Sequence, residues 1–168
     1  MAASTPRARR KVTLERTFDA DIDDVWDLWT TKQGIESWWG PEGFTVSVRE
    51  LDLRPGGVLL YTMTATAPDQ ADFLRKAGMP LANEHRLTYT EVVPRRRIAY
   101  MHLADFIPNV EAYEVATTVD FDGSPRAVRM VLTFDAMHDD RWTDLAVRGW
   151  ESELGRLERL LQGRPAPR

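Results

Sequence analysis

The spacing of hydrophobic residues near the start of the chain indicates one strand followed by helix. Residues 12–18 alternate between apolar and polar side chains, which predicts a half-buried strand. Residues 22–31 carry apolar side chains at helical spacing, behind aspartates that can cap a helix and complement its dipole. Gly34 interrupts this pattern, and residues 35–39 predict a further short turn of helix that Gly40-Pro41 ends.

From residue 44 onward the period of the pattern falls to two, which is typical of β-strands. Sequences such as Arg54-Pro55-Gly56-Gly57 and Asp122-Gly123 divide this region, because proline and glycine supply the backbone angles that turns require. Three antiparallel hairpins are therefore predicted, with strands at residues 44–53 and 58–66, 87–93 and 97–103, and 113–121 and 127–134.

Two segments depart from the alternation. Residues 67–83 hold Phe73 and Leu74 between two prolines, which predicts a short amphipathic helix and a candidate lid. Residues 139–161 place apolar side chains every three or four positions, which predicts a long helix with Glu153 and Arg156 on its polar side. A helix of this length must cover a large apolar surface, and an antiparallel sheet with one dry face supplies one.

The composition fits one globular domain. The chain has 168 residues, of which 43% are hydrophobic and 29% charged. We expect a disordered basic leader at residues 1–11, a single domain at residues 12–162 and a disordered tail at residues 163–168.

Charge and hydropathy restrict the partners. All 26 acidic residues lie in residues 12–163, whereas 6 of the 22 basic residues lie outside that range, so the domain carries about −10 and should repel nucleic acid. The chain lacks the apolar core of a signal peptide and any run approaching the roughly 20 apolar residues of a membrane helix. We therefore expect a cytoplasmic protein with no nucleic-acid partner and no membrane insertion.

Motifs for metals, cofactors and nucleophilic catalysis are absent from the sequence. The chain has no cysteine, and His85, His102 and His138 do not have the local spacing of a metal site. It also lacks a glycine-rich phosphate loop and the serine elbow of a hydrolase. We expect no metal and no cofactor, and we assign no catalytic residue. His138 precedes the long helix, where His138-Asp139-Asp140 suits an N-cap.

Four short motifs span nearly the whole chain. They are Phe18-x-Ala20 before Val25-Trp26, Trp38-Trp39-Gly40-Pro41, Arg54-Pro55-Gly56-Gly57, and Gly149-Trp150 followed by Leu154 and Leu157. In this order they resemble the family named for the activator of the ninety-kilodalton heat-shock chaperone's ATPase, within the START-like superfamily. The chain departs from the family at Asp21, where proline is common, and in the longer segment at residues 67–83.

The resemblance implies the helix-grip fold, an α+β architecture. In it a curved antiparallel sheet of about six to seven strands wraps a long C-terminal helix, two short helices follow the first strand, and a cavity lies between sheet and helix. The candidate cavity residues are Trp29, Trp38, Trp39, Phe44, Met63, Phe73, Tyr100, His102 and Trp150. Of the adjacent indoles Trp38 and Trp39, one should face the cavity. The first hypothesis is therefore a domain that binds a small apolar or aromatic molecule, with residues 67–83 as its lid.

Two other functions remain open. Relatives in the superfamily include polyketide cyclases and aromatases as well as hydrolases, and here Tyr100, His102 and Glu114 would be the first groups to move protons. The family name instead suggests a stress-related co-chaperone with a chaperone partner, and a homodimer is also left open. The binding hypothesis ranks first because catalytic motifs are missing and fold-level analogy is a poor guide to function.

Overall fold

The computed structural model describes residues 9–163, which form seven strands and four helices. In chain order these are β1 (Lys11–Phe18), α1 (Ile22–Thr30), α2 (Lys32–Trp38), β2 (Phe44–Leu51), β3 (Val58–Ala65), α3 (Pro68–Lys76), β4 (Ala82–Val93), β5 (Arg97–Ala104), β6 (Tyr113–Gly123), β7 (Val128–Asp135) and α4 (Asp140–Gln162). The predicted order of strands and helices is confirmed.

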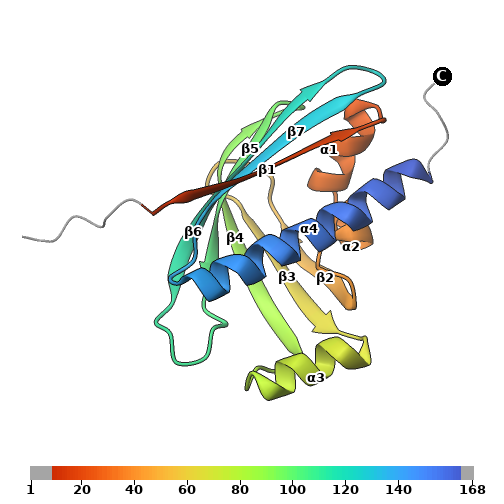
Figure 1. The fold of residues 1–168 in the computed structure, drawn as a ribbon. Helices are drawn as coiled ribbons and strands as arrows, with labels where there is room; N and C mark the ends of the chain where they lie inside the picture. The colour runs from red at the N-terminus through yellow and green to blue at the C-terminus, as the bar shows by residue number, and fades with distance from the viewer. Residues whose placement is uncertain (1–8, 164–168) are drawn as a thin grey trace, which may run out of the picture.

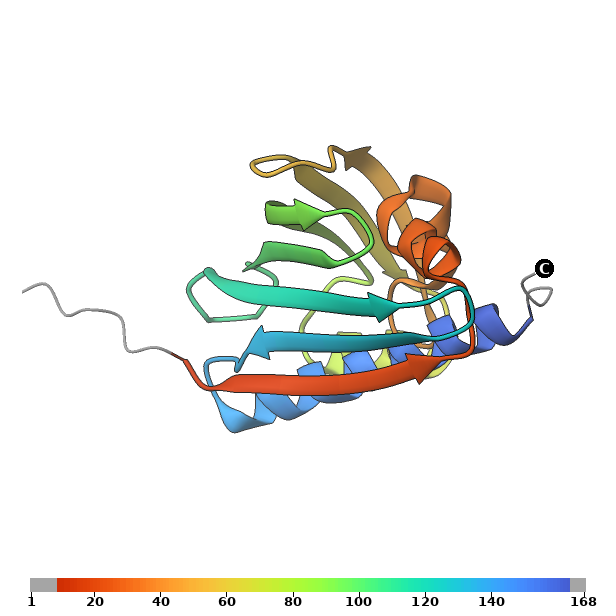
Figure 2. The same ribbon diagram turned by 90° about the horizontal axis from the view of Figure 1, so that it is seen from above.

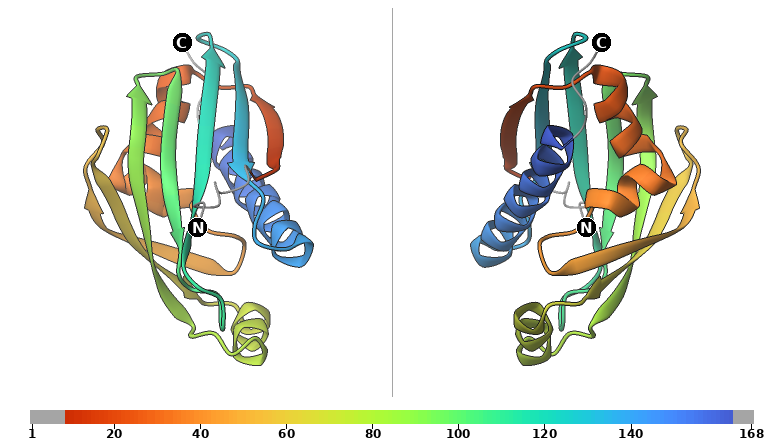
Figure 3. Two further views of the ribbon diagram at one scale, coloured as in Figure 1. Left: turned by 90° about the vertical axis from the view of Figure 1, so that its left-hand side faces the viewer. Right: turned by 90° about the vertical axis from the view of Figure 1, so that its right-hand side faces the viewer.

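The seven strands form one antiparallel sheet in the order β1-β7-β6-β5-β4-β3-β2. Each strand from β2 to β7 pairs with its neighbour in sequence, and β1 pairs with β7 at one edge. The register shifts between Val48 and Glu50 and between Tyr89 and Glu91, and such bulges bend a sheet locally. The sheet curves around the helices, so that α1, α2 and α4 all lie within its concave side (Figures 2 and 3).

The long helix α4 runs diagonally across the concave face (Figure 1). Asp139 is its N-cap, and the Asp139 carboxylate accepts a hydrogen bond from the Trp142 N–H at 2.8 Å. Its later turns enter the core through Leu154, Leu157 and Leu161, whereas the apolar side chains of its first turns are only partly buried. This is the helix-grip fold, as expected. Within residues 9–163, no helix combines the length and apolarity needed to cross a membrane.

The two short helices meet at Thr31, so that α2 begins at Lys32, three residues before the start that the sequence pattern predicted. Thr31 is the C-cap of α1 and the N-cap of α2, and its hydroxyl accepts a hydrogen bond from the Gly34 N–H at 3.0 Å. Gly34 lies inside α2, where a Cβ atom would come within 2.4 Å of the Asp27 carbonyl oxygen. The glycine is therefore explained by the close approach of the two helices, and the prediction that it interrupts the helical pattern was wrong.

The Trp38-Trp39-Gly40-Pro41 sequence forms the corner between α2 and β2. Trp38 is fully buried, and its indole N–H donates to the Leu28 carbonyl at 2.8 Å. Trp39 is the C-cap of α2, and Gly40 has a φ of 91°, a value that favours glycine. Trp38 thus anchors the corner in the core, whereas Trp39 lies between the sheet and α4.

The predicted short helix in residues 67–83 is α3, which lies at the far end of β3 and β4 (Figure 1). Ala71 and Leu74 of this helix pack with Phe44 and Ala65 in a small cluster separate from the main core. Phe73 is 45% exposed, because it lies on the other side of the helix from this cluster.

The first strand begins one residue before the domain boundary predicted at residue 12. Lys11 opens β1, and its ammonium group bonds the Asp135 carboxylate. The Arg9 guanidinium lies 4.2 Å from the centre of the Tyr113 ring. Residues 1–8 and 164–168, which make up most of the expected leader and tail, lie outside the described residues.

Replacing Gly34 with alanine tests the packing of the two short helices. The free energy of unfolding should fall by on the order of 2 kcal/mol, because the helix junction must shift to admit a methyl group. Gly155 on α4 is the matched control, since its Cβ would meet only the flexible Arg159 side chain at 3.5 Å. G155A should be neutral or stabilising by up to about 1 kcal/mol. Equal losses for both variants in urea unfolding would contradict this packing.

Candidate ligand cavity

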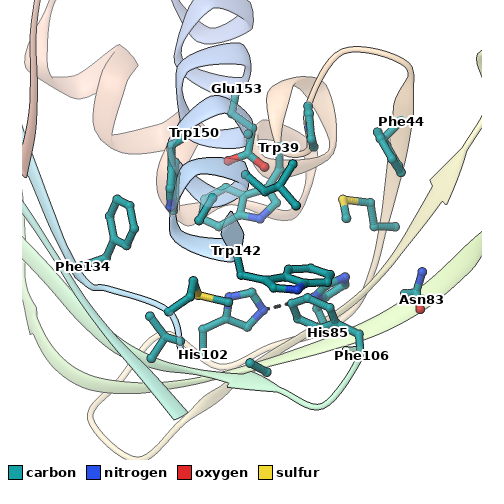
Figure 4. A pocket seen from close by; sticks show the side chains of 18 of the residues that line it. Trp39, Phe44, Asn83, His85, His102, Phe106, Phe134, Trp142, Trp150 and Glu153 are labelled. Carbon is teal, nitrogen blue, oxygen red and sulfur yellow. Dashed lines mark hydrogen bonds between the residues drawn. The ribbon is translucent and has the colours of Figure 1, made fainter. Parts of the chain in front are cut away.

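A cavity of about 240 Å³ lies between the concave face of the sheet and α4 (Figure 4). Most of its wall is apolar, and the large apolar or aromatic side chains in it are Trp39, Phe44, Tyr61, Met63, Leu74, Met79, Tyr100, Phe106, Phe134, Met137, Trp142, Leu145 and Trp150. Its polar side chains, besides the tyrosine hydroxyls, are Asn83, His85, His102, Thr117 and Glu153. An apolar hollow with a few polar groups is typical of a small-molecule site.

Three aromatic rings form the wall near the α2–β2 corner. The Trp39 ring centre lies 6.0 Å from that of Trp150 and 6.2 Å from that of Tyr61, with the rings steeply inclined in both pairs. The Trp39 indole also acts to lower the pKa of the Tyr61 hydroxyl. Burial raises the pKa of both Tyr61 and Tyr100 above the ordinary value of 10, so both phenols stay protonated.

His85 on β4 and His102 on β5 form a pair, called here the histidine pair. His85 Nδ1 lies 3.1 Å from His102 Nε2, so one ring donates a hydrogen bond to the other. Burial lowers the pKa of His85 to about 4, and burial with the adjacent His85 ring lowers the pKa of His102 to about 3. Both rings are therefore neutral at pH 7. His85 Nε2 is buried and has no hydrogen-bond partner among residues 9–163.

Glu153 projects from α4 into the cavity (Figure 4). Its Oε1 accepts a hydrogen bond from the Gly40 N–H at 3.0 Å. Burial raises the pKa of Glu153 to about 8, although the Gly40 hydrogen bond and the charge of Arg156 act in the opposite direction. The carboxyl group is therefore mostly protonated at pH 7.

Arg156 fixes α4 to the chain at residues 40–44. Its Nη1 lies 2.8 Å from the carbonyl oxygen of Gly40, 3.3 Å from that of Pro41 and 3.2 Å from that of Phe44. The sequence pattern placed both Arg156 and Glu153 on the polar, outward side of the helix, and this was wrong. Both side chains turn toward the protein, because the backbone at the corner supplies donors and acceptors that satisfy them.

Six of the nine candidate cavity residues line the cavity and three do not. Those at the cavity are Trp39, Phe44, Met63, Tyr100, His102 and Trp150. Trp29 and Trp38 belong to the core, where each packs against Trp39 with ring centres 5.2 and 5.1 Å away. Phe73 is exposed on α3. Of the adjacent indoles, the one at the cavity is therefore Trp39.

Sequence reasoning missed His85 and Glu153. Glu153 lies three residues after Trp150 and four before Leu157, and this spacing is the signal that could have assigned it to the apolar face instead of the polar one. The contact of His85 with His102 depends on the register of β4 and β5, in which Leu87 lies opposite His102. No local sequence motif reveals that contact.

The suggested catalytic trio of Tyr100, His102 and Glu114 does not form. Tyr100 and His102 line the cavity, whereas Glu114 is exposed on β6 beside the buried Val115. Successive side chains of a strand point to opposite faces, so Glu114 lies on the face away from α4. In the part of the chain from residue 9 to residue 163, no three potential metal ligands lie close enough together to hold an ion.

A family model described as "Activator of Hsp90 ATPase homolog 1-like protein" matches residues 19–162. The chain belongs to this family. The matched range runs from just before α1 to the end of α4, so every element around the cavity is part of the family domain. No curated protein sequence matches the chain significantly. The chaperone partner, the homodimer and the cytoplasmic location stay predictions.

Solved structures share the fold of this chain at low sequence identity. A crystal structure of a Chromobacterium violaceum protein is 22% identical, with a TM-score of 0.74 over 92% of this chain and 98% of the other. The AHSA1-like protein of Aeromonas hydrophila, solved by NMR, is 20% identical, with a TM-score of 0.67 over 91% and 92%. The AHSA1 protein of Silicibacter pomeroyi is 19% identical, with a TM-score of 0.67 over 91% and 98%.

Replacing Glu153 with glutamine should stabilise the protein increasingly as the pH rises from 5 to 8. The unfolded carboxyl ionises near 4.5 whereas the folded one stays protonated up to about 8, so rising pH favours unfolding of the wild type in this range. The difference in unfolding free energy between E153Q and wild type should grow by roughly 2–4 kcal/mol. Urea unfolding at several pH values measures it, and a constant difference would contradict the burial of this group.

The histidine pair should destabilise the protein in acid. The unfolded imidazoles take up protons near pH 6.5 whereas the folded rings resist until about pH 4 and 3, so stability present above pH 6.5 is lost as the pH falls toward 4. The wild type should lose unfolding free energy between pH 6.5 and pH 4, and H102N should reduce that loss by on the order of 1–2 kcal/mol, whatever its effect on stability at pH 7. An unchanged slope in urea unfolding would show that the rings are not buried as a neutral pair.

Proposed function

We propose that this protein binds a small apolar or aromatic molecule in the cavity between the sheet and α4. The observation that carries the proposal is a largely apolar hollow whose wall includes His85, and the buried Nε2 atom of that ring has no partner among residues 9–163. An unpaired buried polar atom destabilises a protein by roughly 1–3 kcal/mol. A ligand would offset that loss if the His85 ring turned its Nε2, which has almost no exposed surface, toward the cavity.

Water is the competing occupant of the cavity. At about 30 Å³ per molecule, 240 Å³ would take roughly eight waters. Each buried water needs two to four polar partners, and aromatic and aliphatic side chains make up most of this wall. Displacing poorly bonded water with an apolar molecule is favourable, so the wall favours an organic ligand.

Gly149 on α4 is a second observation that supports a ligand in the cavity. A glycine inside a helix destabilises it by about 1 kcal/mol relative to alanine. Gly149 lines the cavity, and a Cβ atom there would meet nothing within 4 Å, so packing within the protein does not require the glycine. Room for a guest molecule accounts for a residue that the helix itself disfavours.

The size and entrance of the cavity restrict the ligand. The volume falls just below the roughly 300–1,000 Å³ of drug-sized pockets, which favours a compound of one or two rings. Leu74 of α3 and the following Met79 line the cavity, and α3 is held mainly by a small cluster. An element with few buried contacts opens at low free energy, so α3 suits the role of a lid.

Filling the cavity should block binding without unfolding the protein. A neutral two-ring probe, 1-naphthalenemethanol, should bind the wild type with a Kd on the order of 10–100 μM by isothermal titration calorimetry. G149F should weaken binding at least tenfold, because its ring occupies the same space.

The matched control is G149A, which adds one methyl group to the same position. It should retain binding of 1-naphthalenemethanol and gain up to about 1 kcal/mol of stability from helix propensity. No binding by the wild type, or equal binding by a folded G149F, would overturn the proposed site.

A further inference from the structure

The cavity holds one acid and no base that is charged at pH 7. Glu153 lines it, and no lysine or arginine does. The histidine pair supplies no positive charge, because burial keeps both rings neutral. Arg156 is nearby, but its Nη1 already donates to carbonyl oxygens at residues 40–44. An anionic ligand would therefore meet no free cation in the wall, whereas a cationic ligand would meet an ionisable carboxyl group.

We propose that the ligand carries a protonated amine and that Glu153 is its counter-ion. The inference rests on the proposed function, because it names the chemical class of the molecule that the cavity takes. Among residues 9–163, the hydrogen-bond donor to Glu153 is the Gly40 N–H, at Oε1. A carboxylate has about four lone-pair sites, so an ammonium group in the cavity would find acceptors that the protein leaves unused.

The rings beside Glu153 suit a cation. Trp150 lies three residues earlier on the same face of α4, and the Trp39 ring centre is 6.0 Å from that of Trp150. Tyr61 is close enough for its hydroxyl to be influenced by the Glu153 charge. Because the faces of aromatic rings attract cations within about 6 Å, an ammonium group held at Glu153 would have aromatic rather than aliphatic surroundings.

A neutral Glu153 could instead donate a hydrogen bond to a carbonyl group of the ligand. The two kinds of ligand differ in the number of protons that are released on binding. When a protonated amine binds, the Glu153 carboxyl ionises and its proton passes to the solvent, while the amine keeps its own. With a pKa of about 8, Glu153 should release close to one proton per molecule bound at pH 7. A carbonyl ligand would release none, because it needs the acid form.

The other titratable and charged groups near Glu153 do not change protonation in the pH range of the experiment, so the released proton can be assigned to Glu153. They are Arg156 on α4, Tyr61 on β3, Tyr100 on β5 and, across the cavity, the histidine pair. The histidines titrate near pH 3–4 and the tyrosines above pH 10. Between pH 6 and 7 the affinity for an amine should therefore rise roughly tenfold, following the ionised fraction of Glu153.

Two nearly isosteric probes test the inference: 1-naphthylmethylamine, whose amine is protonated at pH 7, and the neutral 1-naphthalenemethanol. Both are titrated by calorimetry into wild type, E153Q and E151Q at pH 6, 7 and 8, in buffers of different ionisation enthalpy. Glu151 is the matched control, because it is exposed on the same helix. Thermal unfolding shows that each variant is folded.

The wild type and E151Q should bind the amine at least tenfold more tightly than the alcohol at pH 8, with proton release at pH 7. E153Q should lose this preference and the proton release while still binding the alcohol. Equal affinities for the two probes, or a preference for the amine that survives in E153Q, would overturn the amine inference and leave the cavity as a binding site. Failure of the wild type to bind either probe would instead overturn the proposed function itself.

Discussion

The contact between α4 and residues 40–44 determines how the helix lies over the sheet. Arg156 donates to three carbonyl oxygens of this segment, Glu153 accepts the Gly40 N–H, and the Ser152 hydroxyl accepts the Glu42 N–H at 2.9 Å. Hydrogen bonds from a charged group such as the Arg156 guanidinium contribute roughly 1.5–3 kcal/mol, so this is a strong attachment. It ties α4 to the start of β2, at the opposite edge of the sheet from β1.

The attachment explains why the fold contains a hollow. The later turns of α4 are held in the core by Leu154, Leu157 and Leu161, next to the contact with residues 40–44. The earlier turns extend past it over the concave face of the sheet, where Gly149 lines the cavity and offers no side chain to fill the gap. The polar groups left at this gap are the ones that the proposed ligand would satisfy.

The sequence predicted the architecture well because the architecture depends on local periodicity. Six of the seven strands follow a period-two pattern from residue 44 onward, and the long helix shows a clear apolar stripe. The prediction failed where a long-range contact overrides local chemistry. Gly34 acts through a close approach between helices, and Glu153 and Arg156 are polar residues bonded by a distant backbone segment. Predicting the histidine pair would have required the register of β4 against β5, which the pattern of one sequence does not reveal.

A crystal structure of the protein soaked with 1-naphthylmethylamine tests the central claim most directly, because it shows the occupant of the cavity and its polar contacts together. The account predicts a naphthalene ring between the sheet and α4, in contact with Trp39 and Trp150, with the nitrogen within hydrogen-bond distance of the Glu153 carboxylate. Density for ordered water alone in the cavity, or for the compound only on the outer surface, would contradict it.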